Sequence, residues 1–142
     1  MKFHITNFFI LNMKSFKNRR GERDMNDINV HRGDVFYATL TGDGSIQYGI
    51  RPVIIVSNEM NNKHSPTVNV VPLTSKIGKK LLPVHVNIDP NEENGLKMCS
   101  VVLGEQLTII NKTSLKGKKI GCVSNSIMEK IQNAIQIQLG IV

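Results

Sequence analysis

The sequence predicts a mainly β fold with some α structure (α+β): a small, strongly bent antiparallel sheet or barrel, capped by a C-terminal helix. Short apolar and β-branched runs recur between residues 35 and 123, and Gly, Pro, Asn or Asp bounds most of them. One later segment instead has the apolar spacing of a helix. The chain has 142 residues, enough for one domain with its own core, and it contains no internal repeat.

We expect the domain to span residues 27–142, preceded at residues 1–26 by a disordered leader or a mis-annotated start. Residues 1–24 carry six Lys or Arg and two acids, so they supply +4 of the net charge of +7. Arg19–Arg23 can be encoded by purine-rich codons just before Met25, as a translated ribosome-binding site would be. We hypothesise that Met25 is the natural start; upstream peptides in mass spectra of the native protein would contradict this.

The composition indicates an ordinary cytoplasmic protein. Hydrophobic residues make up 40% of the chain and charged residues 20%, and no apolar run is long enough to span a membrane. The two cysteines, Cys99 and Cys122, form neither a disulfide framework nor a metal-ligand pattern. The four histidines also lack metal-binding spacing, so we predict no metal site and no cofactor.

The first half of the predicted sheet surrounds a glycine-rich loop. The expected elements, in order, are a strand at 35–40, the loop at 42–52, a buried strand at 53–58, a polar turn at 61–66 and a strand at 67–74. Pro72 suggests that the last of these strands is an edge strand or has a bulge.

The second half is predicted to contain three more strands and the helix. The strands are expected at 84–88, with His85 on the solvated face, at 98–103 with a possible extension through Leu107, and at 120–123. Ser126 and Glu129 fit a capping box at the start of the helix, and Gly140 is a stop signal. Between these two ends, apolar residues recur at helical spacing from Ile127 to Leu139.

Arg51 and Thr74 are the strongest candidates for a functional site. Arg51 stands where the loop meets the buried strand, and Thr74 ends the next strand. If these strands pair antiparallel, the start of one lies beside the end of the other. A guanidinium beside a hydroxyl is suited to binding a phosphate.

An ordered set of short motifs resembles the MazF/PemK toxins of bacterial toxin–antitoxin systems, from about Val30 to Ile141. Each motif alone is weak, but their order is specific. The motifs are Arg32-Gly33-Asp34-Val35, Gly44-Ser45, Gly49-Ile50-Arg51-Pro52-Val53, Ser65-Pro66-Thr67, Leu73-Thr74, Leu82-Pro83, His85-Val86, Ser100-Val101, Glu105-Gln106 and Thr108-Ile109.

The resemblance implies an SH3-like β-barrel with a C-terminal helix, acting as a homodimer. It implies a ribosome-independent endoribonuclease that cuts single-stranded RNA at a short sequence without a metal. A cognate antitoxin would silence the enzyme by laying its tail across the RNA groove, and any contact with DNA would come only through that antitoxin. Arg51 and Thr74 would be the catalytic pair, promoting attack of the ribose 2′-hydroxyl to leave a 2′,3′-cyclic phosphate and a 5′-hydroxyl.

Several residues around this pair are predicted to bind the substrate, although the loop departs from the family pattern. The predicted substrate-binding residues are Ser45, Gln47, Tyr48, Gly49, His64, Ser75, Lys76 and Gln106. Ile46 stands where the family often has Glu, so the usual carboxylate base is missing. His64 is either a substitute base or a solvated turn residue. Tyr48 either stacks on an RNA base or packs the loop, and Gln106 either reads a base edge or is a buried amide.

Two alternatives to the ribonuclease remain on the same fold. One is a non-catalytic barrel that binds RNA, which the missing Glu makes plausible. The other is a poison of a protein target such as gyrase. The chain ends at Ile141-Val142 without the aromatic tip expected for that activity, and Arg51 with Thr74 favours RNA cleavage.

Overall fold

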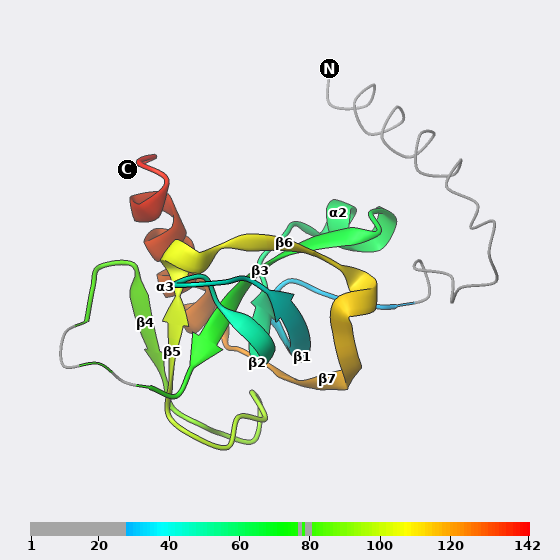
Figure 1. The fold of residues 1–142 in the computed structure, drawn as a ribbon, viewed down its shortest axis with the longest axis horizontal. Helices are drawn as coiled ribbons and strands as arrows, with labels where there is room; N and C mark the ends of the chain where they lie inside the picture. The colour runs from blue at the N-terminus through cyan, green and yellow to red at the C-terminus, as the bar shows by residue number, and fades with distance from the viewer. Residues whose placement is uncertain (1–27, 77, 79–80) are drawn as a thin grey trace.

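Seven antiparallel strands form one bent sheet in the computed structural model, which describes residues 28–76, 78 and 81–142 (Figure 1). The predicted leader at residues 1–26 lies outside the described residues. The elements are β1 (Asp34–Thr41), β2 (Tyr48–Ile55), α2 (Glu59–His64), β3 (Thr67–Thr74), β4 (His85–Ile88), β5 (Ser100–Leu103), the 3-10 turn η2 (Gly104–Gln106), β6 (Thr108–Asn111), the 3-10 turn η3 (Lys112–Ser114), β7 (Leu115–Cys122) and α3 (Asn125–Gln138).

The predicted class, an antiparallel β fold with a C-terminal helix, is confirmed, but the sheet is bent rather than closed into a barrel. The strand order is β4-β5-β3-β2-β1-β7, and β6 pairs with β3 beside this path. Within the described residues, β4 and β7 are the two ends of this order and do not pair with each other. In Figure 1, α3 stands at the end of the sheet that carries β4 and β5.

The sheet buries a hydrophobic cluster on each of its faces. One cluster includes Ile54 and Leu73 and extends to Ile131 and Ala134 of α3. The opposite cluster includes Val53 and is completed by residues from β1, β3 and β7. Because neighbouring residues of a strand point to opposite faces, β2 and β3 contribute to both clusters.

The hairpin between β1 and β2 is longer than the sequence suggested. The predicted loop through Pro52 in fact ends at Gln47, and β2 begins at Tyr48, paired with Thr41. Arg51 therefore lies inside a strand, opposite Ala38, and not at a loop–strand junction. The strand was hidden because its first three residues are exposed and one of them is Gly, so they carry no apolar alternation.

The segment between β2 and β3 contains a short helix where a polar turn was predicted. Asn58 caps α2, since its side chain accepts a hydrogen bond from the Asn61 N–H at 2.8 Å. The next strand, β3, has the predicted bounds. It lies inside the sheet, but Pro72 stands where one edge of the strand has no partner among the described strands, which agrees with the local edge that the proline suggests. Pro72 pairs with Val53 in the middle of the sheet. On the opposite edge of β3, Pro72 lies between the residues that pair with β6 and those that pair with β5. Because that edge has no described partner strand at Pro72, the missing N–H costs no hydrogen bond of the sheet there.

In the second half of the chain, the structure differs from the predicted elements mainly at the turns. The predicted extension of the fifth strand through Leu107 is wrong, because η2 turns the chain so that β6 can pair with β3. Strand β7 is longer than the predicted segment at 120–123. Helix α3 is capped by Ser124, not Ser126, and Leu139 is exposed. The predicted stop at Gly140 is confirmed, with a positive φ of 68°.

A fully buried lysine makes stability depend on pH. Lys112 is 0% exposed, and its Nζ donates to the Asn62 carbonyl at 2.5 Å. Burial lowers the pKa of Lys112 below its ordinary value. Between the lowered pKa and the ordinary one, the unfolded chain binds the proton that the folded protein has released, so stability rises with pH there.

We therefore expect the free energy of unfolding to increase as pH rises through the lowered pKa toward the ordinary lysine pKa, and Lys112→Met to remove this increase. Urea denaturation of both proteins at several pH values measures it. Equal slopes for the two proteins would contradict the assignment.

The turn η2 is held close to β4 by a glycine. A Cβ on Gly104 would clash with the Val84 carbonyl oxygen at 2.6 Å and would crowd the Ala134 Cβ at 3.3 Å.

We expect Gly104→Ala to destabilise the fold by about 1–3 kcal/mol. Gly78 is the control, because no described atom lies within 4 Å of the point that a Cβ would occupy there. Gly78→Ala should change stability by less than about 0.5 kcal/mol. Thermal melts that show no difference between the two variants would disprove the close packing.

Candidate active site

Arg51 projects from the middle of the β1–β2 hairpin and is held by the residue that opens β2. Its Nε donates to the Tyr48 carbonyl at 2.9 Å, and its Cζ lies 6.0 Å from the centre of the Tyr48 ring. The side chain is partly exposed. Because the described hydrogen bond uses only Nε, the two terminal nitrogens of the guanidinium can donate to a ligand.

Thr74 ends β3 on the same side of the sheet. Strands β2 and β3 pair from Ile55 opposite Val70 to Val53 opposite Pro72. This register, extended by two residues beyond its last pair, would set Arg51 opposite Thr74. Residues that oppose each other in an antiparallel pair share a face, with Cβ atoms about 5 Å apart. The Thr74 Oγ1 accepts the Lys76 N–H at 3.2 Å. Its hydroxyl proton can therefore donate to a second group.

A cavity of about 340 Å³ lies beside this pair and is lined by both Arg51 and Ser75. Its other polar and charged lining residues include Lys97 and Ser100, and Tyr37 and Met98 add apolar surface. Lys97, Met98 and Ser100 carry no sequence signal that marks them as site residues. They reach the site because β5 pairs with the end of β3, opposing Val101 to Thr74, and no local pattern signals such a long-range pairing.

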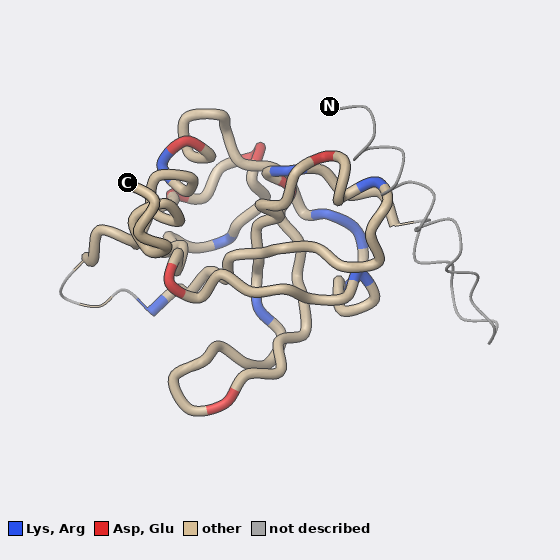
Figure 2. The backbone as a smooth tube through the Cα atoms, turned by 90° about the horizontal axis from the view of Figure 1, so that it is seen from above, with Lys and Arg blue, Asp and Glu red and all other residues tan. Residues whose placement is uncertain are grey.

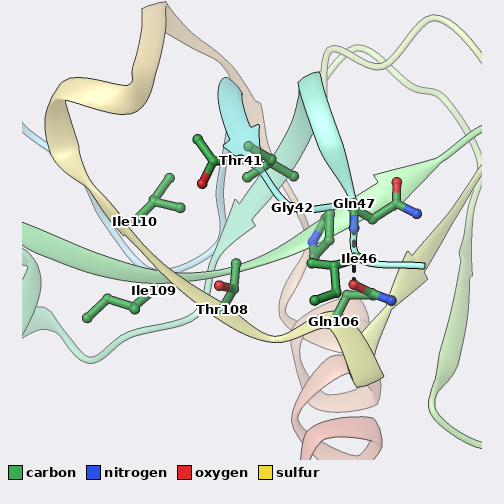
Figure 3. Close-up of a pocket in the computed structure, with 10 residues that line it drawn as sticks. Thr41, Gly42, Ile46, Gln47, Gln106, Thr108, Ile109 and Ile110 are labelled. Atoms are coloured by element: carbon green, nitrogen blue, oxygen red, sulfur yellow. Dashed lines mark hydrogen bonds between the residues drawn. The ribbon is translucent and has the colours of Figure 1, made fainter. Parts of the chain in front are cut away.

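The glycine-rich loop covers a second, smaller cavity of about 160 Å³ (Figure 3). Gln106 enters its lining from η2 and Ile46 from the loop, with Thr108 and Ile110 from β6. The Gln106 amide binds the loop main chain at two points, the Ser45 carbonyl at 3.0 Å and the Gln47 N–H at 3.3 Å. The Oε1 atom of the Gln47 side chain is buried without a hydrogen-bond partner among the described atoms.

The outer side of the hairpin exposes apolar side chains. Ile46, Tyr48 and Ile50 are each more than half exposed, and Gly49 between them has a φ of 80° with open space at its missing Cβ. A glycine suits this position because other residues rarely adopt that backbone conformation. Of these side chains, the Tyr48 ring lies beside Arg51 and is an exposed aromatic face of the kind on which a base can stack.

The predicted histidine candidates lie elsewhere. His64 ends α2, close to the start of β3, while Thr74 is the last residue of that strand. Seven residues of strand separate the two ends of β3, or about 23 Å. The structure therefore does not bring His64 to Arg51 and Thr74.

The prediction that His85 is solvated is wrong. Its side chain is only 15% exposed, and its Nε2 lies 2.9 Å from the Glu105 Oε1. The alternation that predicts β4 also assigns His85 to the polar face, but it cannot show that η2 covers this part of the face.

Charges are spread over the described part of the molecule. Figure 2 shows Lys and Arg at separate positions along the described chain, on several elements. Partial burial raises the pKa of the Glu59 carboxyl, but hydrogen bonds from the Arg32 N–H and from His31, together with the His31 charge, outweigh it and lower that pKa overall. This cluster joins the segment just before β1 to α2.

The described residues contain no group of three or more His, Cys, Asp or Glu arranged to hold a metal ion. None of the helices that the structure describes has the length and apolar character needed to cross a membrane.

The chain matches known toxins in both sequence and structure. Residues 31–139 match the family of PemK-like, MazF-like toxins of type II toxin–antitoxin systems. An endoribonuclease MazF from Staphylococcus saprophyticus is 42% identical over 113 residues, covering 79% of this chain and 92% of that protein.

Among solved structures, a mycobacterial endoribonuclease in complex with its cognate antitoxin superimposes with a TM-score of 0.64 at 28% identity, covering 80% of this chain and 97% of that one. MazF from Deinococcus radiodurans has the same fold, with a TM-score of 0.69 at 19% identity over 80% of this chain and 99% of that one. The match over most of the chain, together with the relative at 42% identity, shows that this chain belongs to the PemK-like, MazF-like toxin family of type II toxin–antitoxin systems.

Proposed function

We propose that this chain is a ribosome-independent endoribonuclease toxin that cuts single-stranded RNA at a short sequence. The observation that carries the proposal is the β2–β3 register, because its continuation by two residues would set Arg51 opposite Thr74, beside a cavity that Arg51 and Ser75 line. Membership of the toxin family and the 42% identity to an endoribonuclease MazF support the activity. The cleavage mechanism and the assignment of the catalytic pair rest on the geometry and on the family resemblance.

The reaction begins with attack of a ribose 2′-hydroxyl on the adjacent phosphorus. The bond to the 5′-oxygen of the next nucleotide breaks, so the products carry a 2′,3′-cyclic phosphate and a 5′-hydroxyl. Negative charge gathers on the phosphoryl oxygens as the new bond forms. The terminal nitrogens of Arg51 and the hydroxyl of Thr74 are placed to donate hydrogen bonds to those oxygens.

Charge stabilisation is the main contribution of this site. Arg51 is preorganised by its bond to the Tyr48 carbonyl, so the protein does not have to reorganise as the charge develops. A single donor of this kind lowers a barrier by about 2.7–4 kcal/mol. None of the described residues that line the cavity at Arg51 is a carboxylate or a His, and a guanidinium stays protonated at neutral pH and so cannot act as the base. Arg51 therefore serves as an electrostatic clamp, while solvent water takes the proton of the 2′-hydroxyl and protonates the leaving 5′-oxygen.

The surrounding residues would bind the RNA on either side of the scissile phosphate. Ser45, Gln47, Tyr48 and Gly49 of the hairpin would contact one flank, with the exposed Tyr48 ring stacking on a base. Ser75 and Lys76 would contact the sugar–phosphate chain beyond Thr74.

Tyr48→Leu should weaken RNA binding, because it removes the aromatic ring, whereas Tyr48→Phe should preserve it. Equal RNA affinities of the two variants would argue against stacking.

The protein would act as a homodimer whose activity a cognate antitoxin blocks, and it would approach DNA only through that antitoxin. A mycobacterial relative was solved in complex with its antitoxin, which supports such a partner here. Light scattering of the purified chain tests the dimer, since a monomer at micromolar concentration would contradict it.

We expect the purified protein to cut a long defined RNA in EDTA at one repeated short sequence. Arg51→Ala and Thr74→Val should each reduce kcat/KM by about 10²–10³-fold, because each removes one donor to the transition-state charge. Lys118→Ala and Thr113→Val, which change exposed residues away from the cavity, are the matched controls. Mass spectrometry of the fragments identifies the cyclic phosphate.

Cleavage that survives Arg51→Ala would contradict the assigned pair. RNA binding without cleavage by freshly purified, antitoxin-free protein would favour the non-catalytic alternative, with Ile46→Glu as the substitution that restores the usual carboxylate.

A further inference from the structure

The turn η2 is fixed to β4 on one side. The Gly104 N–H donates to the Val84 carbonyl at 3.0 Å, and Glu105 binds His85 at 2.9 Å. The other ring nitrogen of His85, Nδ1, accepts the Leu82 N–H at 3.4 Å. This leaves Nε2 as the protonated nitrogen of a neutral ring, donating to Glu105. The turn is therefore anchored by both its main chain and a side chain.

On its other side, η2 presents Gln106 to the glycine-rich loop. The Nε2 of Gln106 donates to the Ser45 carbonyl at 3.0 Å, and its Oε1 accepts the Gln47 N–H at 3.3 Å. The other described hydrogen bonds of residues 42–47 are internal, from Gly42 to Gln47 and from Ile46 to Asp43. Among the described residues, the Gln106 amide thus makes the hydrogen bonds that join this loop to the rest of the molecule.

The residue after this loop holds the catalytic candidate. Tyr48 follows Gln47 directly, and its carbonyl accepts the Arg51 Nε–H at 2.9 Å. The Tyr48 ring lies 6.0 Å from the guanidinium carbon. A displacement of the loop at Gln47 would move this carbonyl and with it the guanidinium.

We propose that Gln106 is a positioning residue that fixes Arg51 by tying the glycine-rich loop to η2. The inference rests on the proposed function, since it assigns Gln106 a place in that same site. The sequence left Gln106 as either a base reader or a buried amide, and in the structure its amide uses a donor and an acceptor on the loop main chain. Glu105 and His85 support Gln106 from the far side of η2.

The test compares Gln106→Ala and Gln106→Glu with the wild-type chain, by amide hydrogen exchange in NMR spectra and by RNA cleavage. Gln106→Ala removes both bonds, whereas Gln106→Glu keeps an acceptor for the Gln47 N–H and loses only the donor. Gln138→Ala, at an exposed glutamine of α3, is the matched control. Thermal melts check that each variant folds.

In Gln106→Ala we expect the Gln47 amide to exchange roughly tenfold faster, as expected for one lost hydrogen bond. We expect kcat to fall by roughly 10- to 100-fold with KM nearly unchanged and with the same preferred RNA sequence, because the reacting groups are misplaced rather than removed. Gln106→Glu should retain the slow exchange at Gln47, and it remains informative if Gln106→Ala does not fold.

Unchanged exchange at Gln47 in folded Gln106→Ala would overturn the inference. So would a changed RNA sequence preference with unchanged exchange, which would identify Gln106 as a base reader. A wild-type chain that cleaves no RNA would instead overturn the proposed function, and the exchange data would still show whether Gln106 holds the loop.

Discussion

Strand β3 pairs with three other strands along its eight residues, and this division determines where each part of the site lies. One edge of β3 pairs with β2, while the other edge pairs first with β6 and then, at its last two residues, with β5. Thr74 therefore opposes Val101 of β5 on one side, and the β2–β3 register, extended by two residues, would set Arg51 on the other. The change of partner also explains how Pro72 is tolerated inside the sheet.

The two hydrophobic clusters hold this register in place. Val68 and Val70 of β3 point into one cluster, while Val71 and Leu73 point into the other. A slip of one residue would exchange the two sets, and it would turn Thr74 away from the face of Arg51. Each buried Val or Leu contributes about 1.5–3 kcal/mol, so core packing strongly resists such a slip. The position of the site thus depends on residues that never contact a ligand.

The sequence alone predicts the elements with strong local signals. The apolar run of β3 gives its bounds. Antiparallel pairing of two such runs is also predicted from the sequence, and it is the basis for expecting Arg51 near Thr74. Gly140 is recognised as a helix stop because its conformation is a local property. The start of β2 is missed because Tyr48, Gly49 and Ile50 are exposed in the hairpin.

Other features depend on contacts between distant segments and carry no local signal. The alternation in β4 predicts that His85 is solvated. In the structure, Glu105 of η2 covers it. Gln106 reads as a possible base reader until its amide is found on the loop, which is 61 positions away in the sequence at Ser45. The cavity residues Lys97 and Ser100 likewise reach Arg51 only through the pairing of β5 with β3.

The central claim is that Arg51 and Thr74 act together on one phosphate. A crystal structure with an RNA oligonucleotide that carries a 2′-deoxy sugar at the cleavage position, and therefore cannot react, tests it most directly. The account predicts that the scissile phosphate lies within hydrogen-bond distance of both the Arg51 guanidinium and the Thr74 hydroxyl. A phosphate bound by only one of them, or seated away from both, would contradict it.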